Sequence, residues 1–238
     1  MALGDGVAEF EPDQDVHGMT SFDRDGVAAE YAAVPVRELS PKPEKLTHVE
    51  AAAIPLPALS AMQGLFDHGR LDKNERVMIH GGAGGVGAYA VQLARLHGAH
   101  TIATASASRV ASARALGADE VIDHTATDFT AIESVDVVFD TAGGERLERS
   151  VEVLGKGGRL VSVVDDPPAT AEEHGIEATW FLVEPNTEQL AELSRLADSG
   201  VMRVLVGRTY PLADARRAFA YLMGQGGSGK VVLSVVEG

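Results

Sequence analysis

The chain has 238 residues, of which 45% are hydrophobic and 23% are charged, as is typical of a globular protein of one or two domains. A formal net charge of −15 without a basic cluster argues against nucleic acid or an anionic membrane as a partner. The absence of cysteine excludes disulfides, a cysteine-ligated zinc site and thiol catalysis. No apolar run approaches the roughly 20 residues of a membrane span, and the amino terminus lacks a signal-peptide pattern, so we expect a cytoplasmic protein.

The amino-terminal region is rich in Gly, Asp and Pro up to about residue 46. It contains two short strand candidates, Val7–Phe10 and Ala28–Val36. Thr47 and Glu50 have the spacing of a capping box, which predicts the start of a short helix. Two prolines follow and are expected to interrupt this helix, and a second helix is predicted over residues 58–68.

From residue 76 to about residue 206, strand-like apolar runs alternate with helical patterns. This rhythm predicts right-handed crossovers and an α/β fold with a doubly wound parallel sheet. The predicted strands are Val77–His80, Thr101–Ala105, Glu120–Asp123, Val135–Asp140, Arg159–Val164 and Ile176–Val183. The predicted helices cover residues 85–97, 109–116, 145–154 and 187–199.

The carboxyl-terminal region predicts a helix over Leu212–Met223, a glycine-rich turn and a final strand over Lys230–Val236. We expect the two ends of the chain to pack together as a small β-rich domain. The predicted division is 1–58 with 208–238 for this domain, and 59–207 for a Rossmann dinucleotide-binding domain.

A glycine-rich turn follows the first strand of the predicted sheet. The chain from residue 76 to residue 87 reads Arg-Val-Met-Ile-His-Gly-Gly-Ala-Gly-Gly-Val-Gly, which contains G-x-G-x-x-G. Gly82 would make the turn, Gly84 would let the backbone approach a pyrophosphate, and Gly87 would let the helix pack on the strand. Free N–H groups at the start of the helix would bind the phosphates. We infer a dinucleotide site here, and a glycine turn kept only for packing is the alternative.

The end of the second strand favours NADP over NAD. An NAD site usually has an acidic residue about 20 residues after the glycines, which binds the ribose 2′-hydroxyl. Residues 103–109 read Ala-Thr-Ala-Ser-Ala-Ser-Arg and contain no acid. Ser106 and Ser108 can donate hydrogen bonds, and Arg109 can pair with a 2′-phosphate. The alternative is that these residues only cap or solvate the start of the next helix.

Short motifs spaced along the chain from about residue 16 onward resemble those of one family. They are Val16-His-Gly-Met19, Ala28-Ala-Glu-Tyr-Ala32, Glu50-Ala-Ala-Ala-Ile-Pro-Leu-Pro57, Ile79-His-Gly-Gly-Ala-Gly-Gly-Val-Gly87, Leu116-Gly-Ala-Asp-Glu-Val-Ile-Asp123, Phe139-Asp-Thr-Ala-Gly-Gly144, Gly157-Gly-Arg-Leu-Val161 and Gly229-Lys-Val-Val-Leu233. The family is that of the zinc-independent, zeta-crystallin-like quinone oxidoreductases of the medium-chain dehydrogenase/reductase superfamily. The resemblance implies a Rossmann domain beside a GroES-like catalytic domain, with the substrate in the cleft between them. It also implies a homodimer, and hydride transfer from NADPH to a quinone, an enone or another activated alkene.

The resemblance also implies site residues. Those near the pyrophosphate are Gly82, Ala83, Gly84, Gly85 and Val86, and those near the adenosine phosphate are Ser106, Arg109 and His124. Those near the nicotinamide are Thr141, Ala142, Val163, Val164, Phe181 and Val183. Ser60 matches a cleft threonine of the family and is the candidate for proton transfer, with helix packing as the alternative. The histidines form no metal-binding motif, and no G-x-S-x-G elbow predicts a hydrolase.

The chain departs from the family in its catalytic half. Family members have a longer β-rich segment before the equivalent of Val16, so we expect a truncated, reduced GroES-like domain. Where the family commonly has Leu-Thr-Ala-Trp or Leu-Thr-Ala-Tyr, the chain has Leu-Ser-Ala-Met at 59–62. Two hypotheses follow. One is an NADPH-dependent reductase of quinones, enones or polyketide-like compounds. The other is a non-reducing homologue that performs a cyclisation or isomerisation in a biosynthetic pathway, or that binds NADP(H) as a sensor.

Overall fold

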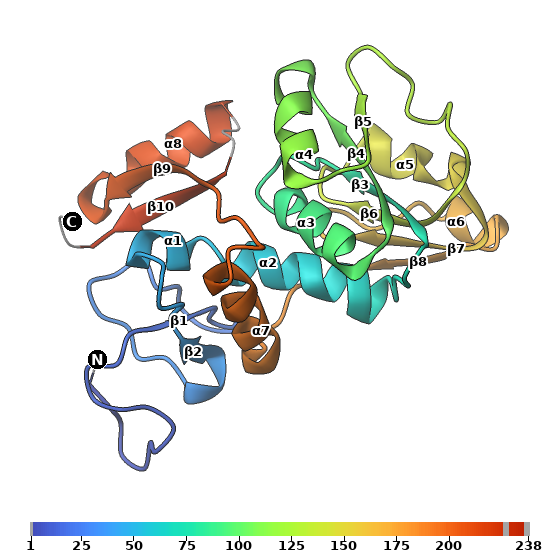
Figure 1. The fold of residues 1–238 in the computed structure, drawn as a ribbon. Helices are drawn as coiled ribbons and strands as arrows, with labels where there is room; N and C mark the ends of the chain where they lie inside the picture. Colours follow the sequence, from blue (N-terminus) through green and yellow to red (C-terminus); the bar gives the residue numbers. More distant parts are fainter. Residues whose placement is uncertain (1, 226–228, 236–238) are drawn as a thin grey trace. The chain divides into compact units, whose positions relative to one another are not determined.

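The computed structural model describes residues 2–225 and 229–235 and divides into two compact units (Figure 1). We call Ser60–Val183 the central unit, and Met1–Leu59 together with Glu184–Gly238 the terminal unit. Residues 184–207, which the sequence placed with the nucleotide-binding domain, therefore fall in the terminal unit. The reason is that α7 (Thr187–Asp198) packs on β2 (Leu39–Pro41).

The central unit is built on one parallel sheet of six strands, in the order β5-β4-β3-β6-β7-β8. The chain begins in the middle of the sheet, winds outward to one edge, returns, and winds outward to the other edge. This order is the doubly wound α/β architecture, so the predicted fold class is confirmed. The strands are β3 (Arg76–His80), β4 (His100–Ala105), β5 (Glu120–Asp123), β6 (Val135–Asp140), β7 (Leu154–Ser162) and β8 (Glu177–Trp180).

Helices cover both faces of this sheet (Figure 1). Those that follow β3 and β4 lie on one face, and those that follow β6 and β7 lie on the other. The chain from residue 124 to residue 134, which connects β5 to β6, has no helix. The helices are α3 (Gly87–His97), α4 (Val110–Leu116) after the short turn η3 (Ala107–Arg109), α5 (Glu145–Arg149) followed by η4 (Ser150–Glu152), and α6 (Thr170–Glu173).

The core on the α5 face joins the sheet to the helices that follow β6 and β7. Met78, Val138 and Leu160 supply apolar side chains from three neighbouring strands, and Leu147 of α5 packs on them. Phe129 fills part of this face from the connection without a helix. Since side chains alternate across a strand, the intervening residues point to the other face of the sheet.

That other face carries a close approach between a helix and the sheet. α2 (Pro55–Met62) continues into a π-helical turn, η2 (Gln63–His68), which packs on β7. A Cβ atom added to Gly64 would lie 2.6 Å from Cζ of the Phe139 ring, so only glycine fits there. The first predicted helix ends at Ala52, before Pro55, so the predicted interruption is confirmed, but the second helix begins at Pro55 rather than at residue 58. α2 begins at Pro55, because the first turn of a helix has no intrahelical use for the missing N–H.

The boundaries of three predicted elements in the central unit change. β7 begins five residues before the predicted strand, because Leu154 already pairs with Val135 of β6, and the pairing continues from Arg159 after a register shift. β8 ends at Trp180 rather than at Val183. The predicted helix over 145–154 is only one turn of α-helix that tightens into η4.

The terminal unit contains two small sheets. β1 (Val16–Gly18) pairs antiparallel with β2, and β9 (Val206–Pro211) pairs parallel with β10 (Lys230–Ser234). α1 (His48–Ala52) and α8 (Ala215–Gln225) pack on the β9–β10 pair. Single turns of 3-10 helix precede β2 and α8, as η1 (Val36–Glu38) and η5 (Leu212–Asp214). The GroES-like assignment of this unit stays an interpretation of the family resemblance.

Several predictions for the terminal unit were wrong, whereas the capping box is confirmed. Val7–Phe10 and Ala28–Val36 form no strand, since neither finds a partner strand, and Tyr31 is 92% exposed. The sequence did not predict β1, β2 or β9. Thr47 accepts the Glu50 N–H, and the Glu50 carboxylate accepts the Thr47 N–H, as predicted. Val236 of the predicted final strand lies outside the described residues.

Candidate functional site

The glycine-rich turn lies at the point where the strand order of the central sheet reverses. It follows the carboxyl end of β3, whose neighbours are β4 on one side and β6 on the other. The chain leaves β3 toward one edge of the sheet and later returns beside it as β6. In open α/β sheets this reversal creates a crevice outside the carboxyl ends of the strands, where ligands bind.

The three glycines of the motif have different neighbours. A Cβ atom on Gly82 would lie 2.6 Å from the Cβ of Ala103, and one on Gly87 would lie 2.8 Å from the carbonyl carbon of Gly81. A Cβ atom on Gly84 would meet a single protein neighbour, the Gly81 carbonyl oxygen at 3.0 Å. Packing therefore explains the glycines at 82 and 87. At 84 the space above the backbone is open, as close approach of a ligand requires.

Donors for an anion are available at the same turn. Gly84 N–H donates to the Gly81 carbonyl at 2.7 Å, which closes the turn, and Ala88 N–H donates to Gly84 at 3.2 Å. Among the described residues, no backbone hydrogen bond is donated by the N–H groups at 85, 86 and 87. These groups precede or begin α3, where the helix dipole favours negative charge. The turn thus fits a pyrophosphate group in its donors and in its free space.

The residues predicted to bind the adenosine phosphate lie on two adjacent loops. His124 N–H donates to the Ala105 carbonyl at 3.1 Å, which holds the end of β5 against the end of β4. Ser106 follows directly, with its Oγ 3.4 Å from that of Ser108. Arg109 lies in η3 at the start of α4. The structure therefore brings Ser106, Arg109 and His124 to one corner of the sheet.

The residues predicted near the nicotinamide lie at the carboxyl ends of β6 and β7. Thr141 donates its hydroxyl hydrogen to the His80 carbonyl at 2.7 Å, so the loop after β6 is tied to the end of β3. Val164 is 44% exposed at the end of β7. Phe181 and Val183 are buried, and the Phe181 ring stacks on His68 at 4.2 Å, so these two residues can offer a ligand mainly their backbone.

Asp140 organises the loop that carries Thr141. Its carboxylate accepts the N–H of Ala142 at 3.3 Å and of Gly143 at 2.9 Å, and it accepts the Ser162 hydroxyl at 3.3 Å. Burial raises the pKa of Asp140, while these hydrogen bonds favour its charged form. The carboxylate therefore holds the loop in place.

Ser60, the catalytic candidate, lies in α2 and is buried, with 3% of its surface exposed. It already interacts with other groups of the protein. Its role in proton transfer stays a prediction. Among the described residues no group of three His, Cys, Asp or Glu side chains could hold a metal ion. None of the described helices combines the length and apolar character needed to cross a membrane.

A buried histidine that the sequence did not single out lies beneath the glycine turn. His80 Nδ1 is 3.1 Å from Thr104 Oγ1, and Nε2 is 3.1 Å from Ser150 Oγ. Because the Ser150 hydroxyl donates to the Arg146 carbonyl at 2.7 Å, it accepts from His80 Nε2–H, and Nδ1 accepts from Thr104. Thr104 Oγ1 in turn accepts the Gly81 N–H at 3.3 Å. Burial, chiefly, lowers the pKa of His80 to about 3, so the ring is neutral.

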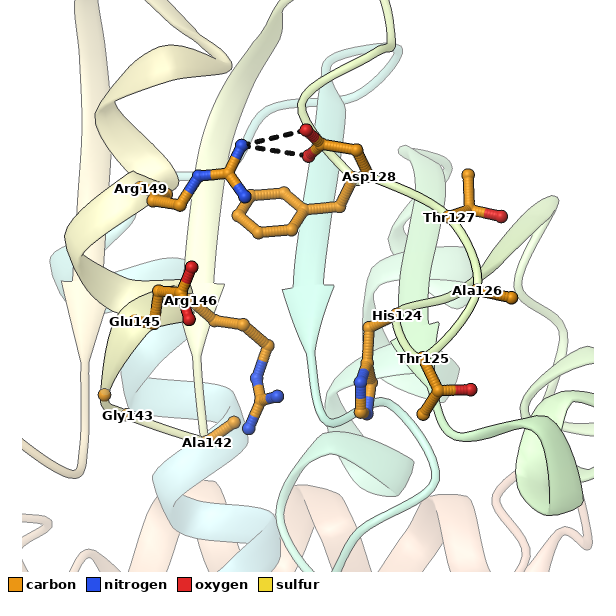
Figure 2. A pocket seen from close by; sticks show the side chains of 12 residues that line it. His124, Thr125, Ala126, Thr127, Asp128, Ala142, Gly143, Glu145, Arg146 and Arg149 are labelled. Carbon is orange, nitrogen blue, oxygen red and sulfur yellow. Dashed lines mark hydrogen bonds and ion pairs between the residues drawn. The ribbon is translucent and has the colours of Figure 1, made fainter.

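A pocket of about 530 Å³ lies beside this histidine, between the chain that follows β5 and the chain that follows β6 (Figure 2). Arg149 spans it and binds Asp128 at 3.0 Å, with its guanidinium 5.4 Å from the centre of the Phe129 ring. Arg146 points into the pocket toward His124. Sequence reasoning missed this pocket, because a charged first turn of a helix is usually a solvated surface. Its lining consists of residues 124–129, 142–146 and 149.

Comparison with known proteins identifies the family. The family model described as zinc-binding dehydrogenase matches residues 116–233. The mitochondrial NAD(P)H oxidoreductase RTN4IP1 of Danio rerio is 30% identical over all of this chain and 70% of its own length. The chain belongs to the medium-chain dehydrogenase/reductase superfamily, among its quinone oxidoreductase-like members. It is therefore an oxidoreductase with a nicotinamide cofactor.

Solved structures agree with this assignment. The quinone oxidoreductase from Coxiella burnetii superposes with a TM-score of 0.90 at 32% identity, over 98% of this chain and 76% of that one. The CurK enoyl reductase superposes with a TM-score of 0.80 at 27% identity, over 98% of this chain and 75% of that one. The predicted recognition of the quinone oxidoreductase family is confirmed.

Proposed function

We propose that this protein reduces a quinone or an α,β-unsaturated carbonyl compound by hydride transfer from NADPH. The family supports the oxidoreductase class, and the names of two similar structures, a quinone oxidoreductase and an enoyl reductase, support the substrate class. The absence of an acid from residues 103–109, and the presence of Ser106 and Arg109 there, support NADP over NAD.

The observation that carries the proposal is the open space at Gly84, at the reversal point of the sheet. The N–H groups at 85–87 would hold the pyrophosphate, and the corner with Ser106, Arg109 and His124 would hold the adenosine end. The loops that end β6 and β7 would hold the nicotinamide. When bound, the reduced nicotinamide supplies the hydride, and the chain positions it. Ser60 is proposed as the group that moves a proton.

NADPH oxidation, followed by absorbance with a panel of benzoquinones, enones and enoyl thioesters, tests the proposal. We expect turnover with at least one acceptor class and a lower KM for NADPH than for NADH. Tight NADPH binding without turnover of any acceptor would reject the reductase and leave the non-reducing alternatives of the sequence analysis. No binding of NADPH or NADH would reject the nucleotide site itself.

A glycine variant tests whether the turn holds the cofactor. In Gly84→Val the side chain would occupy the space proposed for the pyrophosphate, with the Gly81 carbonyl oxygen as its one close protein neighbour, so we expect NADPH binding to be lost. Gly155→Val is the matched control, because a Cβ atom there meets nothing within 4 Å and the residue lies in the same unit. Equal NADPH affinity of both variants would contradict the placement of the pyrophosphate.

We also propose a homodimer formed through the outer strand of the central sheet. β8 pairs with β7 alone among the described strands, and Trp180 is 43% exposed on it. Leu182, just beyond the strand, is 50% exposed. Light scattering should give twice the mass of the chain, and Leu182→Lys should shift the protein toward the monomer. A monomeric wild-type protein would reject this proposal.

A further inference from the structure

We propose that Arg146 is a second cation for the adenosine end of the cofactor, where it binds the 2′-phosphate that distinguishes NADP from NAD. This inference rests on the proposed NADPH-dependent function and names a residue that sets its cofactor specificity. It starts from a contrast between two arginines on the same short helix, α5.

The two arginines differ in their partners. Arg149 is engaged on three sides, by Asp128 at 3.0 Å, by Glu152 at 3.0 Å and by the face of the Phe129 ring. The guanidinium of Arg146 has no hydrogen bond or ion pair among the described residues, and its Nε atom is buried without a partner. Burying an unpaired polar group of a cation is unfavourable, so this side chain is suited to an anion that is not part of the chain.

The direction of Arg146 indicates where that anion lies. Figure 2 shows its guanidinium extending from α5 into the pocket, toward the His124 ring. Arg146 and His124 both line this pocket, and the Ser150 hydroxyl links the Arg146 carbonyl to His80 at the end of β3. His124 is held against Ala105, directly before Ser106. Arg146 therefore reaches the corner of the sheet where the adenosine ribose is expected.

The position of the pocket also indicates which phosphate group is bound. The pyrophosphate has its own donors at the glycine turn, and no residue from 82 to 87 lines this pocket. A phosphate bound by Arg146 is therefore a different one, and on the adenosine side of the cofactor only NADP carries another. Arginine is well suited to it, since the planar guanidinium binds phosphate oxygens through two parallel hydrogen bonds. Two acids line the pocket: Asp128 is paired with Arg149, and Glu145 directly precedes Arg146 in the chain.

Two nucleotide fragments, 2′,5′-ADP and 5′-ADP, test the inference by calorimetry without turnover. Arg146→Met removes the charge and keeps most of the side-chain length. We expect it to weaken 2′,5′-ADP binding by ~10- to 100-fold, as loss of a hydrogen-bonded charge pair does, and to change 5′-ADP binding by less than about twofold. Arg146→Lys should recover part of the loss. Arg114→Met is the control for net charge, because it eliminates one exposed positive charge of α4.

The outcomes separate the inference from the proposed function. If wild-type protein binds neither fragment nor NADPH, the proposed function fails and the inference fails with it. If wild-type protein prefers 2′,5′-ADP and Arg146→Met keeps that preference, the inference alone is overturned. An equal loss of both fragments also overturns it, because Arg146 would then contact a part that NAD shares. Circular dichroism spectra of the variants should match that of the wild type.

Discussion

The central and terminal units satisfy their backbone hydrogen bonds in different ways. The central unit joins six strands in one sheet, whereas the terminal unit has two separate sheets of two strands each. Two-stranded sheets are marginal by themselves and depend on the helices that pack on them. Among the described residues, most of the exposed large apolar side chains lie in the terminal unit, with Met223 86% exposed. We therefore expect the terminal unit to be the less stable of the two.

The two units share one device, a buried histidine bound to a serine. In the terminal unit His17 Nε2 is 2.8 Å from Ser194 Oγ, and in the central unit His80 Nε2 is 3.1 Å from Ser150 Oγ. Burial lowers the pKa of both rings. The two units therefore differ in the arrangement of their strands, but both are expected to lose stability when a buried histidine is protonated at low pH. The single tryptophan, Trp180 in β8, reports on the central unit, and circular dichroism reports on both.

The largest effect is expected at Gly87 of the central unit. In Gly87→Ala the new methyl group meets the Gly81 carbonyl, so the start of α3 must shift, at a cost of about 3 kcal/mol in the free energy of unfolding. Urea unfolding followed by Trp180 fluorescence measures it. Gly155→Ala is the control and should unfold at the wild-type urea concentration. Identical midpoints for both variants would show that the turn is looser than its geometry indicates.

The next effect concerns pH. The pKa of His80 is about 3 in the folded protein and 6.5 as a reference, so the unfolded chain binds a proton more readily. The stabilisation is complete above about pH 6.5 and is lost as the pH falls toward 3, by up to ~1.4 kcal/mol per pH unit. Between pH 6.5 and pH 5 this is about 2 kcal/mol. His80→Gln should flatten the dependence seen by Trp180 fluorescence.

His17→Gln is the matched variant in the terminal unit. It should leave the pH dependence of Trp180 fluorescence unchanged and should flatten only the part of the circular dichroism signal that belongs to the terminal unit. Coincident changes in both signals would show that the two units unfold together, which would remove the expected difference in their stability.

A smaller loss of stability is expected at Asp198, whose side chain accepts hydrogen bonds from backbone N–H groups that have no partner strand. Asp198, at the end of α7, accepts the N–H groups of Glu44 at 3.0 Å and of Lys45 at 2.9 Å. These contacts lower the pKa of Asp198, so its contribution to stability is lost as the pH falls below the usual aspartate range. Asp198→Ala should cost about 1 kcal/mol at neutral pH. Thermal unfolding by circular dichroism measures it, with Asp198→Glu as the control for charge.

The smallest effect is expected at the capping box of α1. Thr47→Ala removes the acceptor for the Glu50 N–H and should cost about 0.5 kcal/mol, because the helix is short and exposed at this end. Thr47→Ser keeps the acceptor and should behave as the wild type. A loss of more than the Asp198 variant shows would mean that α1 anchors the β9–β10 pair more strongly than its length suggests.

The strands of the central unit could be predicted because they are buried on both faces. Val135–Asp140 is an almost continuous apolar run in the sequence, and it is β6 in the structure. The terminal unit gave no such signal. β9 is polar and mostly exposed, so no apolar run marks it. Ala28–Val36 has the composition of a strand but no neighbouring strand to pair with. Whether a segment finds such a strand depends on the whole fold and cannot be read from the segment alone.

Only part of the candidate site could be predicted from the sequence. The glycines of the turn are close together in the chain, and their spacing after a strand predicts a pyrophosphate site. Arg146 is not local, because its relation to His124 depends on how β5 and β6 are placed in the sheet. In the sequence it is one charged residue among several in a short helix. The tautomer of His80 likewise depends on Thr104 and Ser150, which only the folded chain brings together.

The contact between Gly64 and the Phe139 ring has a consequence for sequence divergence. No side chain fits at position 64 while a phenyl ring occupies position 139, and the two positions are far apart in the chain. A substitution at 64 becomes acceptable only after 139 has become smaller, so the order of mutational steps is constrained. Gly64→Ala should be tolerated in a Phe139→Leu background and harmful without it. The pair is thus a site of epistasis, where one position determines which residues the other can accept.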